Sequence, residues 1–377
     1  MAHYFGGSDG GYYPPTRTEQ SSIGYTDGCP FIFRDCPAKK KKEEKTEEKS
    51  KKSGCEKKIL GYTYGYMANR GEYRSPQGIK SQEKLYELGN NWVCLAIANY
   101  QKTFYSTDIY SDYKRTPTER DIKAFVERAH NKKVKVCLKP MLNSEDNMWR
   151  AHIGFPDLNM SDMDIYWNKW FESYTNYITY YAELAEELGC EMFCIGCEML
   201  GTEHRKEDWI ELIKKIRGIY SGKLVYNTNH DHEDTVEWFD MLDYIGTSAY
   251  YPVGDKGINR ESLMKEWEKI KWRLNAIADS RHKKYIFMEI GCRSATSSSA
   301  TPWDFTLDLP WNEDEQALFY ETCFDTFINE ERFAGVFWWD WSTFIYDDRK
   351  DAEKDLGFNI HLKKAEKVVK KYYKEYR

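Results

Sequence analysis

Eight short runs rich in β-branched and aromatic residues recur from residue 59 onward, and this recurrence constrains the fold more than any other feature of the chain. Stretches with helical periodicity separate them, such as 116–132, which opens on Thr-Pro, and 164–189, which ends in glycine. Alternation of strands and helices is typical of parallel βα units. The predicted strands begin at Ile59, Trp92, Val134, Glu191, Lys223, Tyr244, Lys284 and Gly335.

Eight such repeats within residues 58–377 fit a closed (β/α)8 barrel, or TIM barrel, whose usual size is roughly 250 residues with insertions common. An open, doubly wound α/β sheet is the alternative. That fold places a glycine-rich phosphate loop after an early strand, and no strand here is followed by one. The sequence therefore predicts an α/β chain built as a TIM barrel.

Residues 1–57 differ in kind from the rest of the chain. The segment from Lys39 to Lys58 carries ten lysines and five glutamates with almost nothing apolar. Such a segment cannot bury enough surface to offset its ordering entropy. We predict a flexible, low-complexity extension with a Lys/Glu-rich linker over 1–57 and a catalytic barrel over 58–377, although docking of the extension through residues 28–36 stays open.

Charge and hydropathy exclude several classes of partner. The 377 residues include 55 basic and 61 acidic side chains, a balance that gives no reason to expect a nucleic-acid partner. No apolar run reaches the roughly 18 to 20 residues that span a bilayer. The first residues lack the basic and apolar regions of a signal peptide, so we expect a cytoplasmic location, with another secretion route left open.

The run Cys190 to Gly201, CEMFCIGCEMLG, contains the Cys-x-x-Cys spacing of redox and zinc motifs. Strict alternation along a strand puts Cys197 on the helix-facing side with Phe193, and Cys194 on the inner side with Glu198. The two thiols would then face opposite ways. We therefore expect the cysteines to be packing residues and expect no metal, although the loop 229–234, NHDHED, also holds metal-binding residue types.

Two glutamates end equivalent strands. Glu198 follows the fourth predicted strand, and Glu289 ends the seventh, where strict alternation groups it with Tyr285 and Phe287. Barrel enzymes build their active sites at these strand ends. A salt bridge would explain one such glutamate, but two indicate the carboxyl pair of a retaining glycosidase, whose members lie roughly 5 to 5.5 Å apart.

Aromatic residues gather at the same predicted face, where they could stack on sugar rings. They are Trp338, Trp339 and Trp341 in strand eight, Tyr250 and Tyr251 after strand six, and Trp149 beside Arg150 after strand three.

Together these segments resemble glycoside hydrolase family 113, a β-mannanase family of clan A. The resemblance runs from about residue 61 to the C-terminus. It rests on 116–140 (TPTERDIKAFVERAHNKKVKVCLKP), 148–153 (MWRAHI), 243–252 (DYIGTSAYYP), 288–294 (MEIGCRS) and 335–341 (GVFWWDW). It implies a TIM barrel that needs no cofactor. It also implies retaining hydrolysis of β-1,4-mannosidic bonds in mannan, glucomannan or mannooligosaccharides.

The resemblance also assigns roles by position. Glu198 would be the acid/base, Glu289 the nucleophile and Tyr250 the tyrosine that orients the nucleophile. Trp339 or Trp341 would form the floor under the sugar, and further sugar contacts would come from Lys139, Trp149, Arg150, Asn229 and Tyr251.

The chain departs from the clan directly before the acid/base. Many clan members have asparagine there, bound to the sugar 2-hydroxyl, whereas this chain has Cys197, so Asn227 or Asn229 would take over that contact. We expect a monomer whose partner is a β-linked oligosaccharide or polysaccharide. A glycosidase for another β-glycan, such as β-glucan, and a non-catalytic carbohydrate-binding barrel are the alternatives.

Overall fold

The computed structural model describes residues 57–156 and 164–377. The predicted flexible extension, apart from its last residue, lies outside the described residues.

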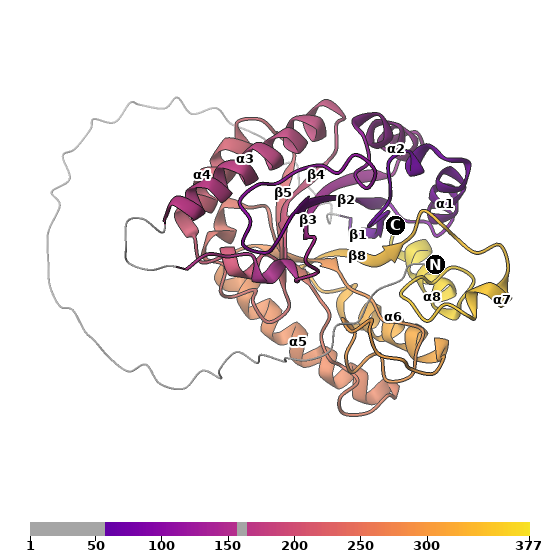
Figure 1. Ribbon diagram of the computed structural model, residues 1–377. Coiled ribbons are helices and arrows are strands. Elements are labelled where there is room, and N and C mark those ends of the chain that lie inside the picture. Colours follow the sequence, from indigo (N-terminus) through magenta and orange to yellow (C-terminus); the bar gives the residue numbers. More distant parts are fainter. Residues whose placement is uncertain (1–56, 157–163) are drawn as a thin grey trace, which may run out of the picture. The chain divides into compact units, whose positions relative to one another are not determined.

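Eight parallel strands form a closed barrel, which confirms the predicted fold (Figure 1). Each strand pairs with the next in sequence, and β8 pairs with β1 to close the ring. The strands are β1 (Ile59–Tyr64), β2 (Trp92–Gln101), β3 (Lys135–Ser144), β4 (Met192–Cys197), β5 (Lys223–Asn229), β6 (Tyr244–Ser248), β7 (Lys284–Glu289) and β8 (Phe333–Trp341).

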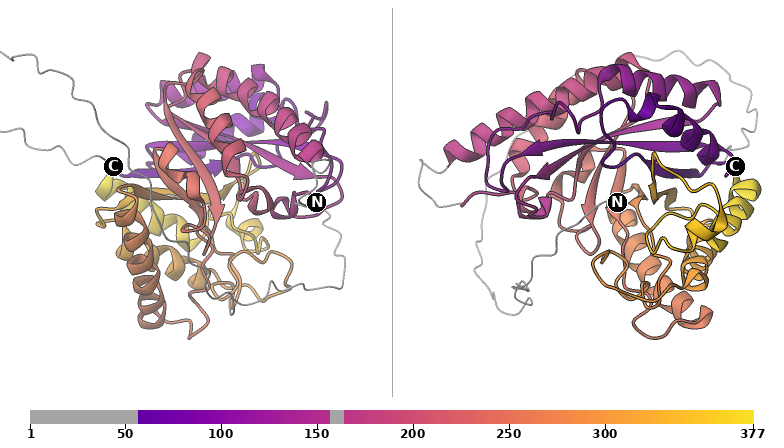
Figure 2. Two further views of the ribbon diagram at one scale, coloured as in Figure 1. Left: turned by 90° about the vertical axis from the view of Figure 1, so that its left-hand side faces the viewer. Right: turned by 45° about the vertical axis from the view of Figure 1, so that its right-hand side comes forward.

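Helices surround the strands, and the long helices α3 and α5 lie on opposite sides of the barrel (Figures 1 and 2). A short 3-10 helix, η4 (Glu237–Met241), connects β5 to β6 where the other connections carry an α-helix. The α-helices are α1 (Pro76–Tyr86), α2 (Glu119–Asn131), α3 (Asp164–Glu187), α4 (Lys206–Arg217), α5 (Arg260–Ser280), α6 (Glu313–Phe327), α7 (Arg349–Ala352) and α8 (Lys364–Tyr376).

Local sequence sets the helix starts. Thr118 caps α2 in a capping box, in which its hydroxyl accepts from the N–H of Asp121 and the Asp121 carboxylate accepts from the N–H of Thr118. Ser75 caps α1, and Pro76 occupies the first helical position. These caps set where α1 and α2 begin after the preceding loops.

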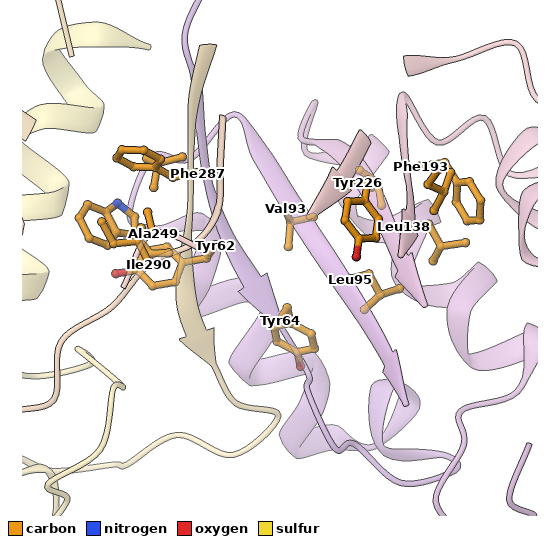
Figure 3. Packing of buried hydrophobic residues seen from close by; sticks show 14 of the residues in the cluster. Tyr62, Tyr64, Val93, Leu95, Leu138, Phe193, Tyr226, Ala249, Phe287 and Ile290 are labelled. Atoms are coloured by element: carbon orange, nitrogen blue, oxygen red, sulfur yellow. The ribbon is translucent and has the colours of Figure 1, made fainter. Parts of the chain in front are cut away.

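Buried apolar side chains form separate layers inside and outside the barrel. The inner layer comes from the strands alone and contains Cys94, Cys137, Met192, Cys194 and Met288, among others. The outer layer joins the strands to the helices, and Figure 3 shows part of it. The alternation predicted for the lower part of β4 is therefore correct.

Strict alternation fails near the top of β4. The pairing of β4 with β5 shifts between Cys194 and Cys197, and Gly196 faces the ring of Tyr226 on the outer side. Cys197 consequently turns inward and packs with Ala96. The prediction that Cys197 faces the helices is wrong because a bulge of this kind changes the phase of the strand.

The grouping of Glu289 with Tyr285 and Phe287 is also wrong. Both aromatic rings lie in the outer layer, whereas Glu289 contacts groups inside the barrel. The pairing of β6 with β7 shifts just before Glu289, between Thr247 and Ser248. Both glutamates therefore reach the interior through local irregularities of their strands.

Candidate active site

Glu198 directly follows β4 and has a left-handed backbone conformation, with φ of 52°. Its N–H donates to the carbonyl of Asn227 on β5 at 2.7 Å, which ties the turn to the barrel. The side chain is buried, and its hydrogen bonds within the described residues are made at Oε2. Trp149 Nε1 and Arg150 Nη1 each donate to Oε2 at 3.1 Å.

The loop after β3 brings these two donors to Glu198. Arg150 is fixed there by further hydrogen bonds, from Nε to the carbonyl of Leu142 (3.0 Å) and from Nη2 to Asn143 Oδ1 (2.7 Å). Burial opposes its charge, but the acidic groups around it, Glu198 among them, hold the pKa of Arg150 above its ordinary value. Arg150 is therefore a permanent cation beside Glu198.

A glycine permits the close approach of the two loops. Gly201, three residues after Glu198, packs so tightly against the loop after β3 that an added Cβ would lie 2.3 Å from the carbonyl oxygen of Ile153. Any side chain here would push apart the segments that hold Glu198 and Arg150.

Glu289, the last residue of β7, is buried and is held through both carboxylate oxygens. Oε1 accepts from Lys139 Nζ, from Asn227 Nδ2 (3.3 Å) and from the thiol of Cys197 (3.3 Å). Oε2 accepts from the hydroxyl of Tyr250 (3.3 Å). Strands β3, β4 and β5 and the segment after β6 thus converge on one carboxylate.

The groups that face Glu289 are a cation and a phenol. Lys139 is fully buried, and burial opposes its charge, but the neighbouring Cys197 and Glu289 hold the pKa of Lys139 well above its ordinary value. Burial, with Glu289 and Glu198 adding, raises the pKa of Tyr250 well above its ordinary value, so the phenol stays a donor. A fixed cation and a neutral phenol therefore face the carboxylate.

A third acidic group, Asp340 on β8, stands near this pair. Burial raises the pKa of Asp340 to about 7, and the negative charges of Asp355 and Glu289 act in the same direction. Asp340 therefore adds little negative charge below neutral pH.

Of the two tryptophans considered for the floor, only Trp339 lies at the site. Its half-buried ring packs against Tyr66 (centroids 4.8 Å apart) and lies 6.0 Å from Lys139 Nζ. Trp341 is fully buried, and its Nε1 donates to the Ser81 carbonyl at 3.1 Å. The prediction for Trp341 is wrong because its ring has no surface left for a sugar.

Tyr251 does not contribute its ring to the site either. It lies buried in the outer layer, where its hydroxyl donates to Glu233 and the guanidinium of Arg273 lies over its ring in a cation–π contact. The predicted sugar contact of Tyr251 is therefore wrong. Asn229 ends β5 and is half-buried, so it remains at the correct edge of the barrel for its predicted contact.

The thiol interpretation finds no structural support. Cys194 and Cys197 are both buried, and burial raises the pKa of Cys194 to about 12 and that of Cys197 well above its ordinary range. Both are therefore neutral thiols. Within residues 57–156 and 164–377, no three His, Cys, Asp or Glu side chains are grouped so as to hold a metal ion. Nor does any helix in that part of the chain have the length and apolarity to cross a membrane.

Sequence reasoning missed two groups at this face. Asp340 could have been noticed, since it stands between the two tryptophans of the motif already singled out. Trp303 lies in the long segment between β7 and α6, is 45% exposed and stacks on His230, which directly follows β5 (centroids 5.4 Å apart). No sequence pattern brings those two rings together.

A closed parallel barrel with two buried glutamates at the ends of its fourth and seventh strands defines a barrel glycoside hydrolase. The chain belongs to glycoside hydrolase family 113, because the model of that family matches residues 62–363.

Solved structures agree with this assignment. A family 113 β-1,4-mannanase, solved as a complex, is 34% identical with a TM-score of 0.78, over 84% of this chain and 99% of that one. The family 113 β-mannanase AaManA from Alicyclobacillus acidocaldarius, in complex with ManMIm, is also 34% identical with a TM-score of 0.78, over 85% and 98%. The β-glucuronidase of Faecalibacterium prausnitzii shares the fold alone, at 11% identity and a TM-score of 0.55 over 85% of this chain and 49% of that chain. A search of curated protein sequences gives no match.

Proposed function

We propose that this glycoside hydrolase cleaves β-1,4-mannosidic bonds with retention of configuration, with Glu289 as nucleophile and Glu198 as acid/base. The observation that carries the proposal is that the two glutamates differ in which carboxylate oxygens accept hydrogen bonds. Lys139 and Tyr250 hold opposite oxygens of Glu289, whereas among the described residues both donors to Glu198 bind Oε2. The mannosidic substrate is supported by the family 113 β-1,4-mannanases that the chain resembles.

The first step forms a covalent glycosyl-enzyme. Glu289 Oε2, which accepts only the long hydrogen bond from Tyr250, attacks the anomeric carbon, while Lys139 neutralises the carboxylate through Oε1. Two donors occupy Glu198 Oε2, so the proton of this carboxyl belongs on Oε1, from which it passes to the departing glycosidic oxygen. The bond to the leaving sugar breaks as the bond to Glu289 forms.

The second step releases the sugar. Glu198, now ionised, takes a proton from water, and the resulting nucleophile attacks the anomeric carbon and displaces Glu289. Two inversions at one carbon give net retention. Arg150 stabilises the ionised form of Glu198 between the two steps, because it stays charged throughout.

The sugar under attack lies over Trp339, whose half-buried ring offers an apolar face. Asn227 donates to both Cys197 Sγ (3.2 Å) and Glu289 Oε1. Its side chain is fully buried, so it positions Glu289, and the half-buried Asn229 is left for the sugar 2-hydroxyl, which neighbours the attacked carbon. Every group in this scheme comes from one barrel, so we expect a monomer to be active, which sedimentation of the active enzyme would check.

A product profile tests the proposal. Mannooligosaccharides and cellooligosaccharides of equal length are incubated with the enzyme, and proton NMR follows the first anomer released. We expect hydrolysis of the mannooligosaccharides, with the β-anomer appearing first. Preference for cellooligosaccharides would overturn the substrate, and the α-anomer would overturn the mechanism. No hydrolysis of either, alongside measurable binding, would indicate a non-catalytic barrel.

A further inference from the structure

A fourth carboxyl, that of Glu203, lies buried behind the site and has no part in the proposed mechanism. Its Oε1 accepts from the hydroxyls of Tyr226 (2.8 Å) and Thr228 (2.7 Å) on β5. Burial raises the pKa of Glu203 to about 7; the two hydroxyls oppose this, while Glu233 and Glu198 add to it. Burying a carboxyl is costly, so a buried carboxyl outside the catalytic pair indicates that the groups it binds have a role.

The hydroxyl of Tyr226 connects Glu203 to the turn that carries Glu198. It donates to Glu203 and accepts from the N–H of Met199 at 3.1 Å, and Met199 directly follows Glu198. The carbonyl of Met199 accepts from the N–H (2.9 Å) and the hydroxyl (2.8 Å) of Thr202. Both polar backbone groups of Met199 are therefore fixed.

The ring of Tyr226 also packs on the bulge of β4. A Cβ on Gly196 would lie 2.9 Å from this ring, so the ring and the strand backbone are in close contact. Tyr226 itself belongs to the outer layer between barrel and helices (Figure 3). It thus holds the turn from behind, on the side away from the sugar.

The backbone of Glu198 needs such support. Its φ of 52° is uncommon for a residue other than glycine, and such conformations persist only where surrounding contacts over-determine them. Its own N–H is fixed by Asn227 on one side, and the N–H of the next residue is fixed by Tyr226 on the other.

We propose that Tyr226, held by Glu203, is a positioning residue for the general acid: it fixes the amide of Met199 and thereby the direction of the Glu198 carboxyl. The inference rests on the proposed function of Glu198. Tyr226 acts only through the turn and makes no contact with the sugar.

Tyr226→Phe tests this with two substrates. The sugar that departs from a mannooligosaccharide is a poor leaving group and needs a proton from the acid. Dinitrophenolate, the leaving group of 2,4-dinitrophenyl β-mannoside, departs without a proton. We expect kcat/KM for the mannooligosaccharide to fall about 10-fold or more, since small misplacements of a catalytic group are costly. For the dinitrophenyl substrate we expect kcat/KM, which reports the first step, to stay within about 3-fold of wild type. Glu198 must still activate water in the second step, so slower release of the glycosyl-enzyme should lower kcat and KM together.

Tyr220→Phe is the matched control. Tyr220 is also buried, and its hydroxyl donates to the carbonyl of Cys190 at 2.6 Å, just before the opposite end of β4. Both substitutions remove one buried hydroxyl beside the same strand. Tyr220→Phe should leave the kcat/KM of both substrates unchanged.

A second pair of variants guards against misfolding of Tyr226→Phe. Glu203→Ala removes the acceptor for the tyrosine hydroxyl and should cause a selective loss of about 3- to 10-fold with the mannooligosaccharide. Glu203→Gln keeps an acceptor oxygen and should recover most of that loss.

Equal losses on both substrates, or the same selective loss in Tyr220→Phe, would overturn the positioning role. An unchanged substrate ratio in Glu203→Ala would do the same. A wild-type enzyme that hydrolyses neither mannoside would instead contradict the proposed function.

Discussion

The two glutamates of the site lie at similar depth but in different surroundings. Glu289 is held through both oxygens and faces a fully buried cation, Lys139. Glu198 is held through one oxygen, and one of its two donors, Trp149, is 42% exposed. Each glutamate has a cation beside it, Lys139 for Glu289 and Arg150 for Glu198, but behind the turn of Glu198 lies a further carboxyl, Glu203.

This difference matches two kinds of chemistry. A nucleophile must stay ionised and keep one direction through the reaction, and buried donors on both oxygens serve that need. An acid/base must exchange a proton twice in each cycle, which requires one oxygen open to the substrate and to water. Under the proposed mechanism, similar glutamates at equivalent strand ends take different roles because the groups on the neighbouring strands differ.

Removal of the nucleophile should have the largest effect. Glu289→Ala is expected to lower turnover of mannooligosaccharides by at least about 10⁴-fold, because the covalent step is lost. Azide can enter the vacated space and attack directly, so added azide should restore turnover of an activated mannoside and give the α-mannosyl azide. Proton NMR of the azide product measures this. Near-normal activity of Glu289→Ala would rule out the assignment.

Removal of the acid/base should have a smaller and more selective effect. Glu198→Ala is expected to lower kcat/KM by roughly 10²- to 10⁴-fold for sugar leaving groups, yet only slightly for 2,4-dinitrophenyl β-mannoside. Azide now attacks the glycosyl-enzyme, so the product should be the β-mannosyl azide. If both variants gave the same anomer, the two roles could not be divided between these glutamates.

Loss of the buried cation should affect stability. Lys139→Met leaves Glu289 as an unpaired buried carboxylate and is expected to lower the free energy of unfolding by about 3 to 5 kcal/mol. Adding Glu289→Gln removes the stranded charge and should recover much of that loss. Urea denaturation of the two single variants and the double variant measures the coupling. Additive effects would show that the two side chains do not interact.

The sequence pattern was sufficient to predict the barrel, but not the direction of the side chains at the C-terminal ends of the strands. Alternation correctly separates Cys194 from Phe193 low in β4, because the inner and outer layers there follow a regular pleat. It fails at Cys197, since the bulge depends on Gly196 meeting the ring of Tyr226 from the next strand. Contacts of that kind join residues far apart in the chain and leave no local signature.

The same limit explains the tryptophans of strand eight. Trp339 and Trp341 stand two residues apart, so simple alternation gives them one face and equal standing as candidates for the floor. The structure separates them, with Trp341 hydrogen-bonded to Ser81 at α1 and Trp339 beside Lys139. Contacts with α1, with Tyr62 on β1 and with His361 bury the ring of Trp341, and none of them can be inferred from strand eight alone.

The carboxyl behind Glu198 should give the smallest effect, on stability as a function of pH. The pKa of Glu203 is about 7 in the folded chain against an ordinary 4.5, because burial opposes its charge. The folded state therefore binds this proton more tightly, and the stability it contributes below about pH 4.5 is lost as pH rises through 7. That difference in pKa corresponds to roughly 3 kcal/mol.

Glu203→Gln removes this titrating group. Relative to wild type, the variant should therefore gain more free energy of unfolding at pH 8 than at pH 4, as urea denaturation at the two pH values would measure. Glu183→Gln, an exposed substitution on α3, is the control and should leave the pH profile unchanged. The stability of Glu203→Gln could instead fall between pH 4 and pH 8 as steeply as that of the wild type. That result would mean that burial does not disfavour the ionised form of Glu203, and the carboxyl behind Glu198 would then no longer distinguish the surroundings of the two glutamates.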